Sequence, residues 1–304
     1  MKPSKNDTLA IVAHDAGAAN HLFAWLKTDV VLFKTLKLCL SGPAKTLYES
    51  QYPSFINHTL EDALSNADYL LSGTSWPSTF EYDARLLAQQ KGIFTIAMVD
   101  HWTNYQQRFN KNKQICLPDS IWVIDNYAES LAKSTFPTVP VHIQANHFIQ
   151  QQVDAIAALE KNKISDPNQH NILFVMEPIA VRWKNQKELS EIQALDYFLL
   201  KKGLLGLKSQ KTDTVEKIII KPHPMDQPGK YQSWLDTTNT KTDIRVDESS
   251  NLAQLIAWSD MVVGCQTYAM VVALEAGKKV ISTLPDYAPP CVLPHKEIIH
   301  LRTL

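Results

Sequence analysis

The stretch from Val215 to Pro228 reads Val-Glu-Lys-Ile-Ile-Ile-Lys-Pro-His-Pro-Met-Asp-Gln-Pro, and it indicates the fold class most directly. Three consecutive isoleucines favour a buried β-strand. The prolines that follow remove backbone donors, so the strand has to end near Lys221. Lys221, His223 and Pro224 therefore form a stiff turn at the carboxyl end of a strand, the edge at which open α/β sheets bind ligands. Contact with a phosphate-bearing ligand is the first hypothesis for His223; the alternative is a histidine that only bonds a neighbouring carbonyl.

Apolar strands and helical patterns alternate on both sides of this stretch. In the second half we expect strands at 171–176, 217–221, 244–246, 261–264 and 279–282, with helices at 190–202, 251–259 and 267–276. In the first half we expect strands at 9–13, 36–40, 69–72, 94–99, 120–124 and 139–143, with helices from about 16 to 26 and at 44–52, 60–67 and 81–91. Residues 30–33 either form another strand or continue a connection. Strands separated by helices predict βαβ units and mainly parallel sheets.

The segment 150–169 begins with an amphipathic pattern and ends in a polar, proline-containing stretch, which is typical of an interdomain linker. A chain of 304 residues is also long enough for two domains. We therefore predict an α/β protein with two Rossmann-like domains, residues 1–150 and 165–304, facing a central cleft.

Composition excludes several classes of protein. The chain is 45% hydrophobic and 20% charged, which is ordinary for a soluble globular protein, and its net charge of −1 creates no global attraction for nucleic acid. The four cysteines are scattered and form no metal-ligand pair, so reduced thiols are expected and no metal site is predicted. The N-terminus lacks a signal segment, and no apolar run reaches the roughly 18 residues of a membrane helix. A cytoplasmic protein is expected, with peripheral membrane association left open.

Two further segments of the second half are candidates for binding an anion. Ser249 and Ser250 precede a predicted helix, where either serine caps that helix or contacts a ligand. Gln266 and Thr267 lie between a strand and a helix, and the free N–H groups and dipole of a helix N-terminus suit phosphate. Glu275 lies about two helical turns beyond Thr267, and it either binds a ribose hydroxyl or is solvated.

The first predicted strand is followed by His14-Asp15-Ala16-Gly17-Ala18-Ala19-Asn20. This segment has one glycine and lacks the spacing of a dinucleotide fingerprint, so a Rossmann cofactor is not expected. The small residue Gly17 would still allow a substrate to approach the backbone. Asp15 or His14 is a candidate general base, and the alternative for Asp15 is a helix cap.

A third group of candidates follows other strands and combines aromatic with polar side chains. Aromatic faces and directional hydrogen-bonding groups are what a sugar site requires, whereas the alternative is a packed structural loop. The residues in this group are Thr74, Ser75, Asp100, His101, Trp102, Arg108 and Arg182, and Glu81 follows close behind the first two.

Several of these segments together resemble a known group of enzymes. Lys221-Pro222-His223-Pro224, Phe174–Pro178 and the run from Ser259 to Ser282 are similar to inverting GT-B glycosyltransferases. The likeness is to bacterial sialyltransferases, polysialyltransferases and capsule-polysaccharide enzymes with a His-Pro motif, and it covers most of residues 170–285.

The resemblance implies roles for individual residues. It implies that His223 contacts the nucleotide phosphate. It also implies that a Ser/Thr pair binds phosphate in the stretch corresponding to Cys265-Gln266-Thr267, in which only Thr267 has a hydroxyl group. The acidic-acidic-Gly motif that supplies the catalytic acid in these enzymes corresponds to His14-Asp15-Ala16-Gly17, so Asp15 is the base by position. The resemblance implies metal-independent chemistry with no cofactor.

The function expected from this resemblance is inverting transfer of a nucleotide-activated sugar in bacterial surface polysaccharide or glycoconjugate biosynthesis. The donor would be a CMP-nonulosonic acid, held by the second domain, and the acceptor a glycan, lipid-linked or protein hydroxyl. Two other enzyme classes are alternatives, a UDP-sugar 2-epimerase and a CDP-glycerol-type phosphotransferase. Outside enzymes, the alternative is a nucleotide-sugar-binding subunit of a polysaccharide assembly system.

Overall fold

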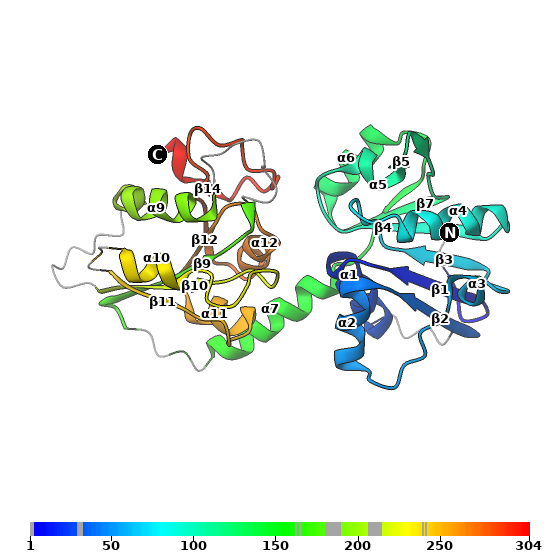
Figure 1. Cartoon of the computed structure of the whole chain (residues 1–304), viewed down its shortest axis with the longest axis horizontal. Helices are drawn as coiled ribbons and strands as arrows, with labels where there is room; N and C mark the ends of the chain where they lie inside the picture. Colours follow the sequence, from blue (N-terminus) through cyan, green and yellow to red (C-terminus); the bar gives the residue numbers. More distant parts are fainter. Residues whose placement is uncertain are drawn as a thin grey trace. The chain divides into compact units, whose positions relative to one another are not determined.

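The computed structural model describes residues 3–28, 33–161, 163, 166–179, 190–205, 215–238, 240 and 242–304. The chain divides into two compact units, Met1–Phe148 and Ile149–Leu304. Each unit contains one six-stranded sheet flanked by helices (Figure 1).

The sheet of the first unit has the order β2-β1-β3-β4-β7-β8, and all its neighbouring strands pair in parallel. Its strands are β1 (Thr8–Ala13), β2 (Thr35–Leu40), β3 (Tyr69–Ser72), β4 (Phe94–Val99), β7 (Ser120–Val123) and β8 (Val141–Ile143). The helices are α1 (Ala16–Thr28), α2 (Gly42–Gln51), α3 (Leu60–Ala63), α4 (Phe80–Gln90), α5 (Tyr105–Phe109) and α6 (Asn126–Thr135). A small antiparallel hairpin joins β5 (Asn110–Lys111) to β6 (Gln114–Ile115).

The sheet of the second unit has the order β11-β10-β9-β12-β13-β14, again entirely parallel. Its strands are β9 (Gln169–Val175), β10 (Val215–Lys221), β11 (Asp243–Val246), β12 (Met261–Gly264), β13 (Lys279–Ser282) and β14 (Ile299–His300). The helices are α7 (His147–Glu160), which spans the division between the units, α9 (Glu191–Lys201), α10 (Gln232–Thr237), α11 (Leu252–Trp258) and α12 (Tyr268–Glu275). Two short 3₁₀ helices are η1 (Lys202–Leu205) and η2 (Leu301–Thr303).

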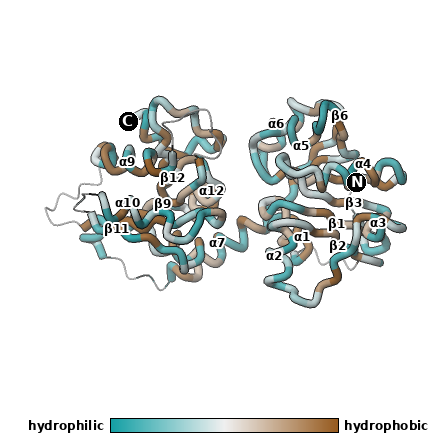
Figure 2. Tube along the Cα trace, viewed as in Figure 1, coloured by the Kyte–Doolittle hydropathy of each residue, from teal (hydrophilic) through white to brown (hydrophobic). Residues whose placement is uncertain are grey.

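The cores explain why these segments fold as they do. In the first unit, Ala10, Val12 and Leu70 pack against Ala84 and Ala88 of α4. In the second unit, Phe174, Ile218 and Ile220 pack against Leu195 and Phe198 of α9. Figure 2 shows the central strands of both sheets as mainly hydrophobic. A strand covered by helices on both faces reads as a continuous apolar run, which is the pattern of residues 9–13 and 218–220.

The expected α/β class and parallel sheets are confirmed. The helix expected at 60–67 is shorter and ends at Ala63, before a turn in which Asn66 is left-handed (φ 56). The sequence did not predict α5, the β5–β6 hairpin, α10 or β14, because each is too short to show a period. Of the ambiguous segment 30–33, residues 30–32 lie outside the description. No helix within the described part of the chain is long and apolar enough to cross a membrane.

Candidate active site

Strand order identifies the positions in each sheet where a ligand is expected. In the first sheet β1 lies between β2 and β3, and in the second β9 lies between β10 and β12, so the chain reverses direction across the sheet at these points. Ligands of open parallel sheets bind at such switch points, beyond the carboxyl ends of the strands. The segments concerned are His14–Asp15 and Gly73–Ser75 in the first unit, and Glu177 and Cys265–Thr267 in the second.

His14 and Asp15 form a side-chain pair immediately after β1. His14 Nδ1 lies 2.7 Å from Asp15 Oδ1, and the two side chains are 28% and 37% exposed. Because an ionised carboxylate can only accept, Nδ1 donates to it, and a neutral ring then keeps its lone pair on Nε2. Gly42 makes room for this ring, since a Cβ there would lie 2.7 Å from His14 Nε2. The pair has the chemistry of an oriented general base.

The cap expected as an alternative role for Asp15 is not what the structure shows. Among the described residues, no N–H of α1 donates to the Asp15 carboxylate, which instead contacts His14. The backbone carbonyl of Asp15 does accept from Ala19 N at 3.1 Å. Asp15 therefore begins the helix through its backbone and leaves its carboxylate to the imidazole.

Glu81 contacts the backbone of this pair, a position that was not deduced from the sequence. The side chain comes from the first turn of α4 and is fully buried. One carboxylate oxygen accepts from His14 N at 2.9 Å and the other from Ser75 N at 2.6 Å. Burial raises the pKa of Glu81, although both N–H groups and Arg85 oppose the shift. The loops after β1 and β3 are thus joined by one carboxyl group.

Asp100 and Arg108 form a buried framework behind the same edge. Arg108 Nη1 lies 3.1 Å from Asp100 Oδ1 and also donates to Thr74 O at 2.8 Å. Burial alone would raise the pKa of Asp100, but Arg108, His21 and His101 outweigh it and lower the pKa. These groups fix the loop after β4 against the loop after β3.

The sugar-site prediction for this third group of residues is only partly compatible with their positions. Thr74, Ser75, Trp102 and Arg108 are buried. Thr74 Oγ1 donates to Met98 O and Trp102 Nε1 to Asp125 Oδ2, both at 2.8 Å. We therefore correct their role from ligand contacts to a framework under the loops, because their polar atoms are used within the protein. His101 is half-buried and contacts Thr103 Oγ1 at 3.0 Å, and Arg182 lies outside the described residues.

Gly17→Ala should destabilise the first unit. A Cβ at position 17 would lie 2.2 Å from Asp100 Oδ2, and Arg108 prevents that carboxylate from moving freely. Overpacking of this kind typically costs about 1–3 kcal/mol. Urea unfolding followed by circular dichroism measures the loss. Gly203→Ala is the control, because a Cβ there meets nothing within 4 Å; equal stabilities of the two variants would refute the close-contact explanation.

Acidification should destabilise the protein through His21, which is buried on α1. Burial lowers its pKa from 6.5 to about 4, although Asp100 opposes the shift. The unfolded chain therefore binds more protons than the folded one between pH 6.5 and 4, so stability falls as pH decreases through this window. The loss between pH 7 and 5 should be about 2 kcal/mol in urea unfolding. His21→Gln should flatten this slope and exposed His142→Gln should not; a slope unchanged by His21→Gln would contradict the assignment.

In the second unit, His223 lies on a turn closed by Asp226. Asp226 Oδ2 accepts from His223 N at 2.9 Å, and Asp226 N donates to His223 O at 2.8 Å. His223 Nδ1 accepts from Met225 N at 3.2 Å, so a neutral ring carries its proton on Nε2. The imidazole is thereby oriented as a hydrogen-bond donor. Pro224 beside it is exposed.

Buried charges hold Asp226 in place. Tyr231, which is buried, donates its hydroxyl to Asp226 Oδ2 at 2.7 Å, and Lys230 Nζ lies 2.6 Å from Asp226 Oδ1 and also pairs with Glu191. Burial alone would raise the pKa of Asp226, but the hydrogen bonds from Lys230, Tyr231 and His223 lower it. The sequence offered one signal for this support, an acidic residue three positions after the histidine.

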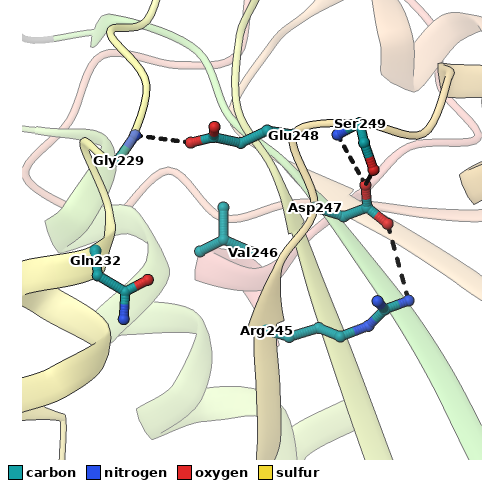
Figure 3. Close-up of a pocket in the computed structure, with 7 residues that line it drawn as sticks. All are labelled: Gly229, Gln232, Arg245, Val246, Asp247, Glu248 and Ser249. Atoms are coloured by element: carbon teal, nitrogen blue, oxygen red, sulfur yellow. Dashed lines mark hydrogen bonds and ion pairs between the residues drawn. The ribbon is translucent and has the colours of Figure 1, made fainter.

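Lys221 begins the same turn and lies beside a pocket at the end of β11. Its Nζ donates to Glu248 O at 3.1 Å, which uses one of its three N–H groups. The pocket has a volume of about 430 Å³, and Figure 3 shows its lining residues, which are Gly229, Gln232, Arg245, Val246, Asp247, Glu248 and Ser249. Glu248 Oε1 accepts from Gly229 N at 2.8 Å. The pocket is mainly polar and adjoins the turn without including His223.

The capping role considered for Ser249 and Ser250 is wrong. Asn251 caps α11 by accepting from Gln254 N, and Gln254 completes a capping box. Both serine hydroxyls and both serine N–H groups donate to Asp247. In this arrangement the serine hydroxyl oxygens can accept a hydrogen bond from a ligand, but their protons are donated to Asp247.

The N-terminus of α12 lies at the second switch point. Gln266 is buried, its N–H donates to Glu177 Oε2 at 3.2 Å, and its Oε1 accepts from Val292 N at 3.2 Å. Thr267 is half-buried at the N-cap, and its side chain makes no capping bond. β10 and β12 flank β9, so the His223 and Thr267 segments start about 10 Å apart.

The structure does not bring Glu275 to this edge. Glu275 is the exposed last residue of α12, about 12 Å along the helix from Thr267. The spacing of Thr267 and Glu275 suggested a similar helical face, but a shared face does not bring together two residues that are this far apart along the helix axis. No group of three His, Cys, Asp or Glu side chains within the described residues has an arrangement that could hold a metal ion.

Comparison with known proteins supports the fold. Neither a family model nor a curated protein matches the sequence. A UDP-GlcNAc 2-epimerase from Methanocaldococcus jannaschii is similar over 92% of this chain and 84% of its own, with TM-score 0.58 and 11% identity. A putative UDP-N-acetylglucosamine 2-epimerase from Listeria monocytogenes is similar over 93% and 80%, with TM-score 0.57 and 13% identity. The Neisseria meningitidis UDP-GlcNAc 2-epimerase bound to UDP-GlcNAc is similar over 92% and 83%, with TM-score 0.54 and 14% identity. At these identities the likeness shows the fold, so the chain has a GT-B-like fold.

Proposed function

We propose that this protein is a glycosyltransferase that uses a nucleotide-activated sugar. The observation that carries the proposal is the pair of His14 and Asp15, with Nδ1 and Oδ1 2.7 Å apart at the switch point of the first sheet. Its half-exposed position suits abstraction of a proton from an acceptor hydroxyl. The acid-base chemistry would then reside in the first unit.

In the proposed reaction the geometry favours His14 as the base and Asp15 as its partner. Asp15 accepts the hydrogen bond from Nδ1–H, which orients the ring and stabilises the imidazolium that forms when Nε2 takes up the proton of the acceptor hydroxyl. The hydroxyl oxygen attacks the anomeric carbon of the donor as the bond from that carbon to the phosphate oxygen breaks. This changes the expectation from the sequence, in which Asp15 itself was the base.

The second unit would stabilise the leaving phosphate. The Nε2 donor of His223 and the ammonium of Lys221 lie at the end of β10, and the start of α12 adds its dipole. Donors that are oriented before the reaction stabilise negative charge as it develops, with little reorganisation. A nucleotide-sugar ligand is also supported by the fold shared with an epimerase structure that contains UDP-GlcNAc.

For the donor we propose a CMP-nonulosonic acid, because residues 170–285 resemble the sialyltransferase and capsule-polysaccharide group. The test is incubation of the purified protein with CMP-, UDP- and CDP-linked donors and a panel of glycan acceptors, with mass spectrometry of the products. Nucleotide release that depends on acceptor with the CMP donor alone is expected. Turnover with only a UDP or CDP donor would overturn the CMP assignment, and nucleotide binding without any turnover would favour a binding subunit.

A UDP-sugar 2-epimerase is the second candidate, and the observation that favours it is the fold likeness to three solved 2-epimerases. An epimerase inverts a carbon of the sugar while no acceptor is present. Proton NMR of UDP-GlcNAc incubated with the protein in D₂O distinguishes the two functions. Appearance of a C2-inverted product under these conditions would reject the transferase proposal.

A further inference from the structure

We propose that Glu81 is a positioning residue for the His14–Asp15 pair, holding the loops after β1 and β3 in one arrangement with a single buried carboxyl group. This inference rests on the proposed function for its catalytic consequence, but its structural part can be tested without turnover. Neither the sequence patterns nor the comparisons assign such a role to Glu81.

The contacts of Glu81 reach both loops. Its two oxygens accept from His14 N and Ser75 N at 2.9 and 2.6 Å, and the side chain is fully buried. The loop after β3 is shaped around it, because a Cβ on Gly73 would lie 2.3 Å from Glu81 Oε1. A carboxyl group that receives N–H bonds from two loops fixes the residue whose imidazole is the proposed base.

Arg85, one helical turn further along α4, contacts the loop after β3. Its Nη1 donates to Gly73 O at 2.9 Å and to Ser72 Oγ at 3.1 Å, while Nη2 donates to Arg108 O at 3.1 Å. Glu81 therefore holds the N–H side of the β3 loop and Arg85 holds its carbonyl side. Together they connect α4 to the loops of β1 and β3 and to α5.

Charged groups on α4, in the loop after β1 and on the β5–β6 hairpin act electrostatically on Glu81. Arg85 on α4 favours the ionised form, while burial and Asp15 oppose it. Lys111, on the β5–β6 hairpin, interacts electrostatically with both Glu81 and Asp15 and donates to Trp76 O. Glu81 therefore lies among charged groups that include the Asp15 carboxylate.

Glu81→Gln tests this role because it keeps the size of the side chain but removes one acceptor. The amide oxygen can accept from one backbone N–H, and the amide NH₂ then faces the other, so one loop is released. The imidazole ¹⁵N and Nδ1–H signals of His14, assigned with His14→Gln, should shift or broaden. If the proposed transfer activity is present, kcat should fall up to about 100-fold with little change in donor KM, since a small misplacement of a catalytic group has effects of this size.

Asp119→Asn is the matched control, because Asp119 also accepts a backbone N–H, from Thr95 at 2.7 Å, near the start of β4 in the same sheet. Circular dichroism and thermal unfolding establish that both variants are folded. Glu81→Asp, which keeps the charge but is shorter, should restore part of the His14 signal.

The outcomes separate this inference from the proposed function. A wild-type His14 spectrum in folded Glu81→Gln would overturn the positioning role, as would an equal change in Asp119→Asn. A changed His14 spectrum in Glu81→Gln alone supports it. If that change occurs and wild-type protein transfers no sugar from any donor, the proposed function fails while the positioning role remains.

Discussion

His14→Gln is expected to lower kcat by about 10³-fold, with donor affinity nearly unchanged. General acid–base catalysis typically contributes 10²- to 10⁴-fold, and glutamine cannot take up the acceptor proton although it fills a similar volume. The interaction with Asp15 makes His14 more than a surface histidine, because Asp15 Oδ1 lies 2.7 Å from its Nδ1. Single-turnover kinetics with the donor identified by screening measures the effect.

Two controls define the role of His14. His58→Gln removes another His–Asp pair of the first unit, in which His58 Nδ1 lies 2.5 Å from Asp62 Oδ2, and should leave kcat unchanged. Imidazole added to His14→Ala should restore part of the activity, because it can supply the missing base. If His14→Gln retains more than about a tenth of kcat while Asp15→Asn is inactive, Asp15 is the base and His14 is not.

His223→Ala is expected to lower kcat by about 10²- to 10³-fold, the usual loss when one preorganised donor to a developing anion is removed. Donor affinity should fall as well, because a ground-state phosphate uses the same N–H. The orientation of the ring supports this expectation, since Met225 N donates to Nδ1 and leaves Nε2 as the donor. Calorimetric titration with CMP and UDP measures affinity independently of turnover.

Met225→Ala is the control for His223, because its side chain is 79% exposed on the same turn. It should bind nucleotide as the wild type does. Asp226→Asn should weaken binding less than His223→Ala, since it loosens the turn but keeps the imidazole. Unchanged nucleotide affinity and turnover in His223→Ala would remove this turn from the donor site.

The sequence predicted the sheet strands well because a strand that is buried on both faces appears in the sequence as a short apolar run. Residues 9–13, 96–99 and 218–220 are apolar without interruption, as strands covered on both faces require. Elements such as α5 and the β5–β6 hairpin were missed because they span only a few residues. The left-handed Asn112 and Lys113 that turn this hairpin are not a strong sequence signal for it.

The candidate site was predicted unevenly for a related reason. The turn from Lys221 to Pro224 was recognisable from its own residues, because prolines end a strand wherever they occur. Thr74 and Arg108 looked equally suitable for a ligand, yet the fold uses their polar atoms internally. Arg108 Nη1 donates to Thr74 O at 2.8 Å and to Thr74 Oγ1 at 3.1 Å. Exposure depends on neighbours that are distant in the chain, so residue type alone could not separate these cases.

The sequence by itself determined the α/β class, the order of the sheet strands other than β14, and the placement of His14, Asp15 and His223 just after strands. These features depend on local apolar patterns and on proline, which act over a few residues. Only the tertiary structure decided that Glu81 joins His14 to Ser75, 67 and 6 positions away along the chain. It also decided that Asp226 orients the His223 turn with Tyr231 and Lys230. Such contacts depend on how strands and helices pack, because a buried carboxyl group is stable only where the folded chain supplies its donors.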